Sequence, residues 1–314
     1  MFDIVRYTAD RAEEWNRFVA QSKNGTFLFD RGYMDYHSDR FRDHSLMVYD
    51  GKRLFALLPA CDDGQGTLWS HRGLTYGGLV MSDQCRAASV LDVFRLLNLY
   101  LRREGFQRVV YKHVPWPYSV WPAEEDLFAM VSECKAVVRS RDIASVVDLQ
   151  RRLPLSTLRR RGVKKAVAAG LRVEQTTDFA AFWRVLEENL MTRFGATPVH
   201  TLSEITLLNA RFPDRILLYG AYRDEELLGG TVLYACGQTV KTQYISATEE
   251  GKQKGALDLL FDRLLSHFAT EGLRYFDFGT SNRVDNDALN APLIFQKEGF
   301  GGRAVCYDTY EWSL

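Results

Sequence analysis

Short runs of alternating hydrophobic and polar residues come in the same order in both halves of the chain. FDIVRY at 2–7 and LRVEQT at 171–176 each predict a short strand, and each leads into a stretch with helical periodicity. A strand, a polar turn and a second strand then follow in both halves, beginning at Phe41 and at Phe212. Each of these patterns predicts an antiparallel hairpin.

A long amphipathic helix ends at a Glu-Gly pair in each half, at Glu104-Gly105 and at Glu271-Gly272, and a further strand follows. The glycines stand where a helix end favours a left-handed residue. All matching landmarks are offset by 167 to 171 residues, which indicates an internal repeat. We therefore expect an α/β (α+β) fold with two tandem domains, each a mixed, mostly antiparallel sheet flanked by helices. Two unrelated α/β domains with similar elements are the alternative.

The repeat and the length of 314 residues together favour two domains. We expect an N-terminal domain over 1–145, a basic linking helix over 146–170 and a C-terminal domain over 171–314. In the linking segment, Pro154 is expected in the first helical turn, and Gly170 is expected to end the helix.

The linking segment is strongly basic, with seven cations and no acid between Arg151 and Lys165. If it is helical, Arg161, Lys164 and Lys165 lie near one face, because residues three and four apart are neighbours. These three are candidate substrate-binding residues that would hold a phosphate. A solvated helix surface is the alternative.

The overall charge, the cysteines and the histidines of the chain indicate no further partner or metal site. Forty Lys and Arg balance 40 Asp and Glu, so DNA is not an expected partner. Five cysteines without a C-x-x-C pair favour a reducing compartment, and the six histidines lack ligand spacing, so no metal is expected. The charged N-terminus does not resemble a signal peptide, and no apolar run reaches the length of a membrane span. We expect a cytoplasmic protein without a transmembrane segment.

Common catalytic motifs are missing: G-x-S-x-G, H-E-x-x-H and the Walker A pattern do not occur. TQYISATEEGKQKGALDLL, from Thr242, instead predicts a strand, a polar turn and the start of a helix. The N–H groups of such a start can hold a phosphate. The candidate cofactor-binding residues there are Lys252, Lys254, Gly255 and Ala256.

On the strand before this turn, strict alternation places Gln243 and Ile245 on one face. The same rule places Thr242, Tyr244 and Ser246 on the other face. Gln243 and Tyr244 are candidate substrate-binding residues, and core packing is the alternative for Tyr244.

The stretch YFDFGTSNRVDNDALNAPLIFQKEGFGG begins as a strand at Tyr275. Alternation predicts that Phe276 and Phe278 pack on one face while Tyr275 and Asp277 take the other. Gly279 ends the strand where two backbones part or a ligand approaches closely. Three residues that follow, Thr280, Ser281 and Asn282, are further candidate substrate-binding residues. The polar loop after them is expected to cover the site, and an ordinary surface loop is the alternative.

Several of these segments together carry a family resemblance: LRRRGVKKAVAAGLRVEQ, PVHTLSEITLLNARFPDRI, QYISATEEGKQKGALDLL and the stretch from Tyr275 to Gly302. The second half resembles the GNAT acyltransferase fold, and the whole chain resembles the FemAB-like group, which joins two such domains. In that group, an F-D-F-G-x-S strand end followed by F-x-K-E-G-F is characteristic.

The resemblance implies transfer of an acyl or aminoacyl group to an amine. Donors are then acyl-coenzyme A or aminoacyl-tRNA, used as substrates, with no tightly bound cofactor. The acceptor would be a small-molecule or lipid-linked amine, including a phosphate-bearing or cell-envelope precursor, and tRNA is a possible partner. Lys252 to Leu257 matches the GNAT pyrophosphate pattern only at the central glycine and a cationic start, and no long helical arm is inserted.

The resemblance also implies a location for the site. Strands 242–248 and 275–279 would splay apart, with the acyl donor between them. Lys297 would contact the acceptor or the developing charge, and a salt bridge from Lys297 to Asp277 is the structural alternative. Ile294 and Phe295, on the same helix, are expected to pack inward.

The candidates for the catalytic base are Asp277, Glu298 and His200. A histidine has the pKa best suited to accept a proton near neutral pH. The alternative for His200 is that it only caps the helix that starts near Thr201.

Two other functions are compatible with the sequence. The first is a ligand-binding protein that kept the duplicated fold and lost the chemistry. The second is a tRNA-binding factor built on the basic helix.

Overall fold

The computed structural model describes residues 2–283 and 288–314. The chain forms two compact units. Unit 1 contains the chain up to Asp142 together with Cys306–Leu314, and unit 2 is Ile143–Val305. Two long strands, β9 (Val137–Asp148) and β15 (Arg303–Ser313), each run from one unit into the other.

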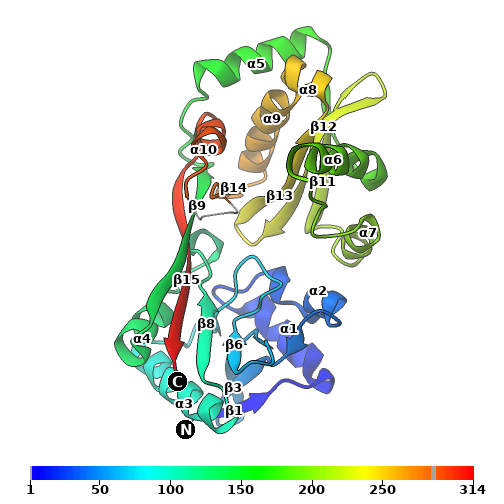
Figure 1. The fold of residues 1–314 in the computed structure, drawn as a ribbon. Helices are drawn as coiled ribbons and strands as arrows, with labels where there is room; N and C mark the ends of the chain where they lie inside the picture. Colours follow the sequence, from blue (N-terminus) through cyan, green and yellow to red (C-terminus); the bar gives the residue numbers. More distant parts are fainter. Residues whose placement is uncertain (1, 284–287) are drawn as a thin grey trace. The chain divides into compact units, whose positions relative to one another are not determined.

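Unit 2 is built on a mixed sheet (Figure 1). Its order is β10 (Arg172–Thr176), β11 (Ile216–Arg223), β12 (Glu226–Cys236), β13 (Thr239–Ala247), β14 (Tyr275–Thr280) and β9. Neighbours are antiparallel except β13 and β14, which are parallel. The helices are α5 (Thr157–Ala168), α6 (Phe179–Phe194), α7 (Leu202–Arg211), α8 (Glu249–Lys254), α9 (Ala256–Thr270) and α10 (Ala291–Glu298).

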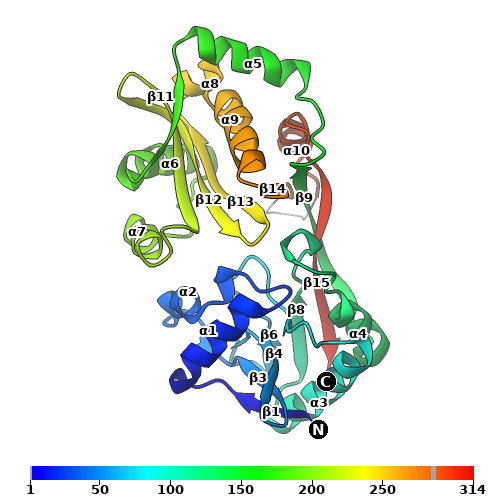
Figure 2. The same cartoon turned by 180° about the vertical axis from the view of Figure 1, so that it is seen from behind.

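Helix α9 supplies most of the core of unit 2. Four of its leucines and Phe261 are buried with Leu233, Val240 and Phe276 of the sheet in one cluster. The opposite face of the sheet is covered by α6, where Asn189 donates a hydrogen bond to the Ser246 hydroxyl at 2.9 Å. Both faces of the sheet are thus packed against helices (Figures 1 and 2).

Unit 1 contains a four-stranded sheet and one end of an 11-stranded sheet, whose other end consists of the strands of unit 2 given above. One sheet has the order β1 (Phe2–Arg6), β3 (Leu46–Asp50), β4 (Arg53–Leu58) and β7 (Val80–Met81). The second contains β15, β8 (Arg108–Lys112), β6 (Thr67–Trp69), β5 (Cys61–Asp62) and β2 (Arg42–Asp43). The helices are α1 (Ala12–Gln21), α2 (Arg31–Met34), α3 (Ala87–Arg103) and α4 (Glu125–Cys134).

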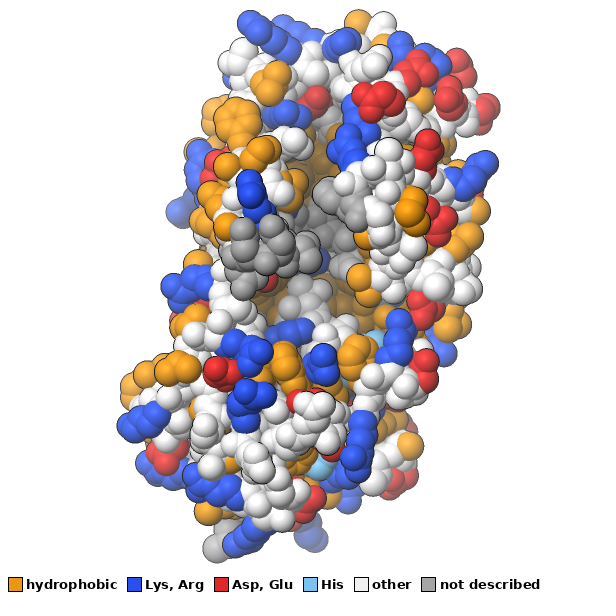
Figure 3. All heavy atoms as spheres, in the orientation of Figure 1, with side chains coloured by type: hydrophobic (Ala, Val, Ile, Leu, Met, Phe, Trp, Pro, Cys, Tyr) orange, Lys and Arg blue, Asp and Glu red, His pale blue; other side chains and the backbone are white. Residues whose placement is uncertain are grey.

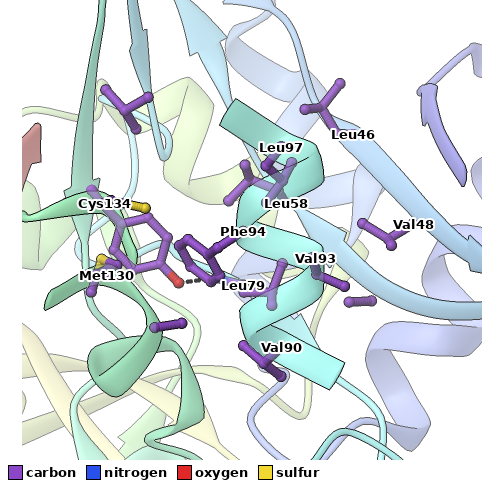
Figure 4. Close-up of a cluster of buried hydrophobic side chains, with 14 of the residues drawn as sticks. Leu46, Val48, Leu58, Leu79, Val90, Val93, Phe94, Leu97, Met130 and Cys134 are labelled. Carbon is purple, nitrogen blue, oxygen red and sulfur yellow. Dashed lines mark hydrogen bonds between the residues drawn. The ribbon is translucent and has the colours of Figure 1, made fainter. Parts of the chain in front are cut away.

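The core of unit 1 forms around α3 (Figure 4). Phe94 of α3 packs with Leu46 and Leu58 of the first sheet. The cluster also holds a polar link: the Tyr111 hydroxyl accepts a hydrogen bond from the Leu79 N–H at 2.5 Å and donates one to Asp126 at 2.6 Å. Buried polar atoms in this core are therefore paired with one another, as a low-dielectric interior requires.

The tandem fold predicted from the repeat is confirmed. Strand β1 matches β10, the hairpin β3–β4 matches β11–β12, helix α3 matches α9, and β8 matches β14. Gly105 and Gly272 follow α3 and α9 with left-handed φ angles of 86° and 83°, as the Glu-Gly pattern predicted. The antiparallel hairpins were also predicted correctly.

The basic segment differs from its prediction at its start. Helix α5 begins at Thr157, because the Ser156 side chain caps it by accepting a hydrogen bond from the Arg159 N–H. Pro154 therefore precedes the helix, whereas Gly170 follows its end with a φ of 73°. The expected domain limits at 145 and 170 stay a prediction, and the compact units meet at 142/143 and 305/306.

Candidate active site

The parallel pairing of β13 and β14 is short. Its register partners are Thr239 with Tyr275, Val240 with Phe276, and Lys241 with Asp277. Both strands then continue, β13 to Ala247 and β14 to Thr280, without further register partners between them. The two strands therefore separate beyond Lys241 and Asp277, and we call this point the fork.

A β-bulge lies at the fork. On β12, the adjacent residues Val232 and Leu233 pair with Tyr244 and Thr242, so Gln243 is an extra residue on β13. Adjacent residues on β12 point to opposite faces, and so do their partners Tyr244 and Thr242. The prediction that Thr242 and Tyr244 share a face is wrong, because strict alternation does not allow for a bulge.

The faces of β14 are as predicted. Phe276 and Phe278 pack on Phe261 of α9, with ring centroids 6.0 and 4.9 Å apart. Asp277 therefore points to the opposite face of the sheet, and its register partner Lys241 points the same way.

Tyr244 lies on this same face. Lys241 is paired with Tyr234 and Tyr244 with Val232, and those two β12 residues are two positions apart. The face away from α9 thus carries Asp277, Lys241 and Tyr244 near the fork.

Three charged side chains, Lys241, Asp277 and Lys297, are buried at the fork and form what we call the lysine–aspartate cluster. The Asp277 carboxylate accepts a hydrogen bond from the Gly279 N–H at 2.6 Å. Lys297 donates to the carbonyl oxygens of Gly279 at 2.9 Å and Thr280 at 2.6 Å. Helix α10 and the end of β14 are thereby tied together through a charged group.

Burial lowers the pKa of both lysines. The pKa of Lys297 falls to about 8, because desolvation disfavours its ammonium and the nearby Lys241 adds repulsion, against an opposing effect of Asp277. The pKa of Lys241 is also lowered by burial, and the negative charge of Asp277 offsets only part of that effect. Among the described residues, one carboxylate, Asp277, therefore balances two lysines.

The residues after β14 have different environments. Thr280 is exposed, and Ser281 is fully buried with no partner for its hydroxyl among the described residues. The Asn282 side chain accepts a hydrogen bond from the Ile143 N–H at 2.8 Å. The predicted cover formed by the loop that follows falls partly on residues 284–287, which lie outside the described residues.

His200 is paired with Tyr244. Its Nδ1 lies 2.6 Å from the Tyr244 hydroxyl oxygen, and its backbone N–H donates to the same oxygen at 3.2 Å. The helix cap is Thr201, which forms a capping box with Glu204, so the alternative that His200 caps this helix is wrong.

Helix α10 turns Lys297 inward and Glu298 outward. Ile294 and Lys297 are buried, because residues three apart share one face. Phe295 is 63% exposed, so the prediction that it packs inward is wrong. Glu298 is exposed on the outer side of the helix.

The expected polar turn before α9 is helical. Thr248 caps α8 by accepting a hydrogen bond from the Gly251 N–H. The polar residues that follow Thr248 therefore form a helix and not a turn. Lys252 lies 2.9 Å from the Asn189 side-chain oxygen and 3.3 Å from Glu249, and Lys254 lies 3.6 Å from Glu250. Both lysines are thus engaged locally.

The start of α9 is covered by α5. A Cβ atom on Gly255 would lie 2.5 Å from the Gly162 carbonyl oxygen, and Ala256 is fully buried. Arg159 closes the contact through an ion pair with Asp258 at 2.6 Å. Helix α5 is therefore packed against the start of α9, and phosphate binding at this start stays a prediction.

The remaining predicted residues lie on the outer face of α5. Arg161, Lys164 and Lys165 are exposed, and none forms an ion pair within the described part of the chain. The structure brings Asp277, Lys297 and Gln243 together, since Gln243 accepts a hydrogen bond from Lys241 at 3.2 Å.

Sequence reasoning missed Lys241. The signal was a lysine within a strand of otherwise uncharged residues, TVKTQYIS, at the position that pairs with Asp277. In residues 2–283 and 288–314, no group of three or more His, Cys, Asp or Glu side chains is arranged to hold a metal ion. In the same residues, no helix has the length and apolar character needed to cross a bilayer.

Comparison with known proteins agrees with this geometry. Residues 156–286 match the model of the acetyltransferase (GNAT) domain family. No curated protein matches the chain in sequence.

Three solved structures share the fold over nearly the whole chain. FemX is 10% identical with a TM-score of 0.71, covering 99% of this chain and 97% of its own. L-PGS from Bacillus licheniformis is 12% identical with a TM-score of 0.62, covering 97% and 91%. A tandem GNAT protein from the clavulanic acid biosynthesis pathway is 14% identical with a TM-score of 0.52, covering 100% and 98%.

The family match contains the fork and the strands that form it, and the fold likeness extends to both units. Residues 156–286 therefore match the acetyltransferase (GNAT) domain family, and the whole chain has the tandem GNAT fold of these solved structures.

Proposed function

We propose that this protein transfers an aminoacyl group from aminoacyl-tRNA to the amine of a phosphate-bearing or lipid-linked cell-envelope precursor, with the fork as the active site. The observation that carries the proposal is the lysine–aspartate cluster. A buried group with more cations than anions is costly unless an anion complements it. A substrate carboxylate or phosphate, or the oxyanion of an acyl-transfer intermediate, would supply that negative charge.

The reaction balances without a cofactor. The acceptor amine attacks the carbonyl carbon of the donor ester, and a C–N bond forms. The carbonyl oxygen carries negative charge in the tetrahedral intermediate, which collapses as the C–O bond to the donor breaks. The amine loses a proton and the leaving hydroxyl gains one.

Lys297 stabilises the oxyanion in this proposal. An ammonium has three N–H donors, and the Gly279 and Thr280 carbonyls accept two of them. The third is available to a developing negative charge. Carbonyl contacts hold the ammonium in place before the reaction, and such preorganised donors are typically worth about 3 kcal/mol of barrier.

The other polar residues divide the remaining tasks. Asp277 offsets the two buried lysines and fixes the turn after β14 through the Gly279 N–H. His200 accepts the amine proton through the Tyr244 hydroxyl, since the two groups lie 2.6 Å apart. Gln243 positions Lys241.

The choice of donor rests on the start of α9. The close approach of the Gly162 carbonyl to Gly255, at the start of α9, supports a donor that has no diphosphate. A carbonyl oxygen repels a phosphate, and α5 would have to move for one to bind. An aminoacyl ester of tRNA needs no diphosphate there.

The acceptor class is supported by the structural relatives. One of them is the C-terminal domain of a putative lysylphosphatidylglycerol synthetase from Agrobacterium fabrum. The name of that protein describes a product in which a lysyl group is attached to a phospholipid. Its TM-score is 0.61 at 12% identity, so the likeness shows the fold alone. A phosphate-bearing acceptor would also suit the positive charge at the fork.

The test uses two labelled donors in parallel. The protein is incubated with ¹⁴C-aminoacyl-tRNA or with ¹⁴C-acetyl-coenzyme A, and with a lipid extract or a small-molecule cell extract as acceptor. We expect label to pass from the tRNA ester to an extract compound and not from the thioester. Transfer from acetyl-coenzyme A alone would overturn the donor assignment, and no transfer from either donor would overturn the proposal.

A further inference from the structure

Helix α5 presents a surface that the proposed reaction does not use. Its exposed cations are Arg160, Arg161, Lys164 and Lys165, and the segment from Leu149 to Gly170 contains no acid. None of the four forms an ion pair with a described residue. By contrast, Arg159 on the inner side of the helix pairs with Asp258. The outer face therefore keeps its full positive charge.

Large apolar side chains are exposed on the same surface. Leu158 is 54% exposed on α5, and Phe295 is 63% exposed on α10. The two segments are in contact, because the Ser156 N–H donates to the Gly299 carbonyl at 2.8 Å. Leu153 and Val167 are also exposed. Figure 3 shows hydrophobic and basic side chains side by side over α5 and α10.

We propose that this α5–α10 surface docks unit 2 on an anionic lipid surface, with the cations on lipid phosphates and the apolar side chains among the headgroups and upper acyl chains. A nucleic acid would use the cations alone, because exposed leucine and valine side chains gain nothing from a phosphate backbone. An anionic membrane uses both kinds of group, as amphipathic interfacial helices do. The combination therefore favours lipid.

The position of the surface fits such docking. Helix α10 carries Phe295 on its outer side and Lys297 on its inner side, where it reaches the Gly279 carbonyl. The same short helix thus links the proposed lipid contact to the fork. The docking proposal does not depend on the reaction, because it concerns the opposite side of α10.

The experiment is sedimentation with vesicles of equal parts phosphatidylglycerol and phosphatidylcholine, compared with vesicles of phosphatidylcholine alone. The native protein is expected to bind the anionic vesicles and to be weakened by salt. A charge variant replaces all four cations, Arg160→Gln, Arg161→Gln, Lys164→Gln and Lys165→Gln. Because each cation near an anionic surface contributes roughly a fivefold factor, partitioning should fall by more than about 100-fold.

Two further variants separate the contributions. An apolar variant, Leu158→Ser with Phe295→Ser, should lower partitioning roughly tenfold, because both side chains leave the interface. A matched control removes four exposed cations of unit 1 and should bind like the native protein: Lys52→Gln, Arg53→Gln, Arg102→Gln and Arg103→Gln. All replaced side chains are exposed, so melting temperatures should stay close to that of the native protein.

Clear outcomes would overturn the proposal. The first is that the native protein does not sediment with anionic vesicles at low salt. The second is that the charge variant and its unit 1 control lose vesicle binding equally. The third is that the apolar variant binds vesicles like the native protein. The same variants are titrated with bulk tRNA. If the charge variant loses tRNA binding while its vesicle binding is unchanged, α5 is a nucleic-acid surface instead.

Discussion

Lys241 and Asp277 form the last register pair between β13 and β14, and both side chains are buried on the face of the sheet away from α9. The pair marks the place where the two parallel strands separate. Lys297 reaches the same place from α10 by donating to the Gly279 carbonyl, two residues after Asp277 on β14. Three elements, β13, β14 and α10, therefore bring two lysines and one carboxylate together.

Asp277→Asn should reduce transfer and stability together. The amide keeps the size of the side chain but no longer offsets the two buried lysines, so their ammonium groups become more costly. We expect a loss of roughly 3 kcal/mol in the free energy of unfolding, measured by denaturant titration at pH 7. The double variant Asp277→Asn, Lys241→Met should recover part of it, and an equal loss in both variants would show that Lys241 and Asp277 are not coupled.

The depressed pKa of Lys297 predicts how stability changes with pH. Between its folded pKa of about 8 and the ordinary lysine value, the unfolded chain binds more protons than the folded one. Stability therefore rises with pH in this window, because the cost of the buried ammonium, about 3 kcal/mol, is relieved. Denaturant titrations from pH 7 to pH 10 should show a smaller rise in Lys297→Met than in the native protein, because the lowered pKa values of Lys241 and Lys112 contribute to the rise in both. Gln296→Met, on the same helix, should keep the rise.

Activity should show the opposite dependence on pH. If the Lys297 ammonium stabilises the oxyanion, kcat/KM falls about tenfold per pH unit above pH 8, because the ammonium is lost. Lys297→Arg retains its charge at that pH, so any remaining activity should stay level between pH 8 and pH 9.5. A rate that instead rises through pH 8 would mean that the neutral lysine acts as a base.

The close contact of α5 with α9 can be tested with two glycines. Gly255 and Gly272 both have left-handed φ angles, 79° and 83°, so alanine costs about 1 kcal/mol of backbone strain at either position. Only at Gly255 would the new methyl group meet the Gly162 carbonyl, at 2.5 Å. Gly255→Ala should therefore destabilise the protein by about 1–3 kcal/mol more than Gly272→Ala. Equal melting temperatures would mean that α5 does not cover the start of α9.

The architecture could be predicted from the sequence, because each half repeats the same hydrophobic periods and the same helix-ending glycines. The hairpins and the two faces of β14 follow from period-two alternation, which depends on local sequence alone. Lys297 was predicted from the resemblance to FemAB-like proteins, and Asp277 was predicted as a candidate base.

Other features depend on contacts that no local pattern contains. Lys241 becomes a site residue only through its pairing with Asp277, and the bulge at Gln243 changes the faces of β13 after that point. The covered start of α9 depends on the close approach of Gly162, about 90 residues away in sequence. Phe295 faces outward because α10 uses Ile294 and Lys297 for its inner face.

The central claim, that Lys297 at the fork takes part in transfer, is tested most directly by the rate of label transfer from ¹⁴C-aminoacyl-tRNA in three proteins. Lys297→Met should fold with a melting temperature near that of the native protein, because it loses two carbonyl contacts and a buried charge together. Its kcat/KM should fall at least about 100-fold. Gln296→Ala, the exposed neighbour on α10, should transfer at the native rate. A Lys297→Met protein that is folded and transfers as fast as Gln296→Ala would contradict the account.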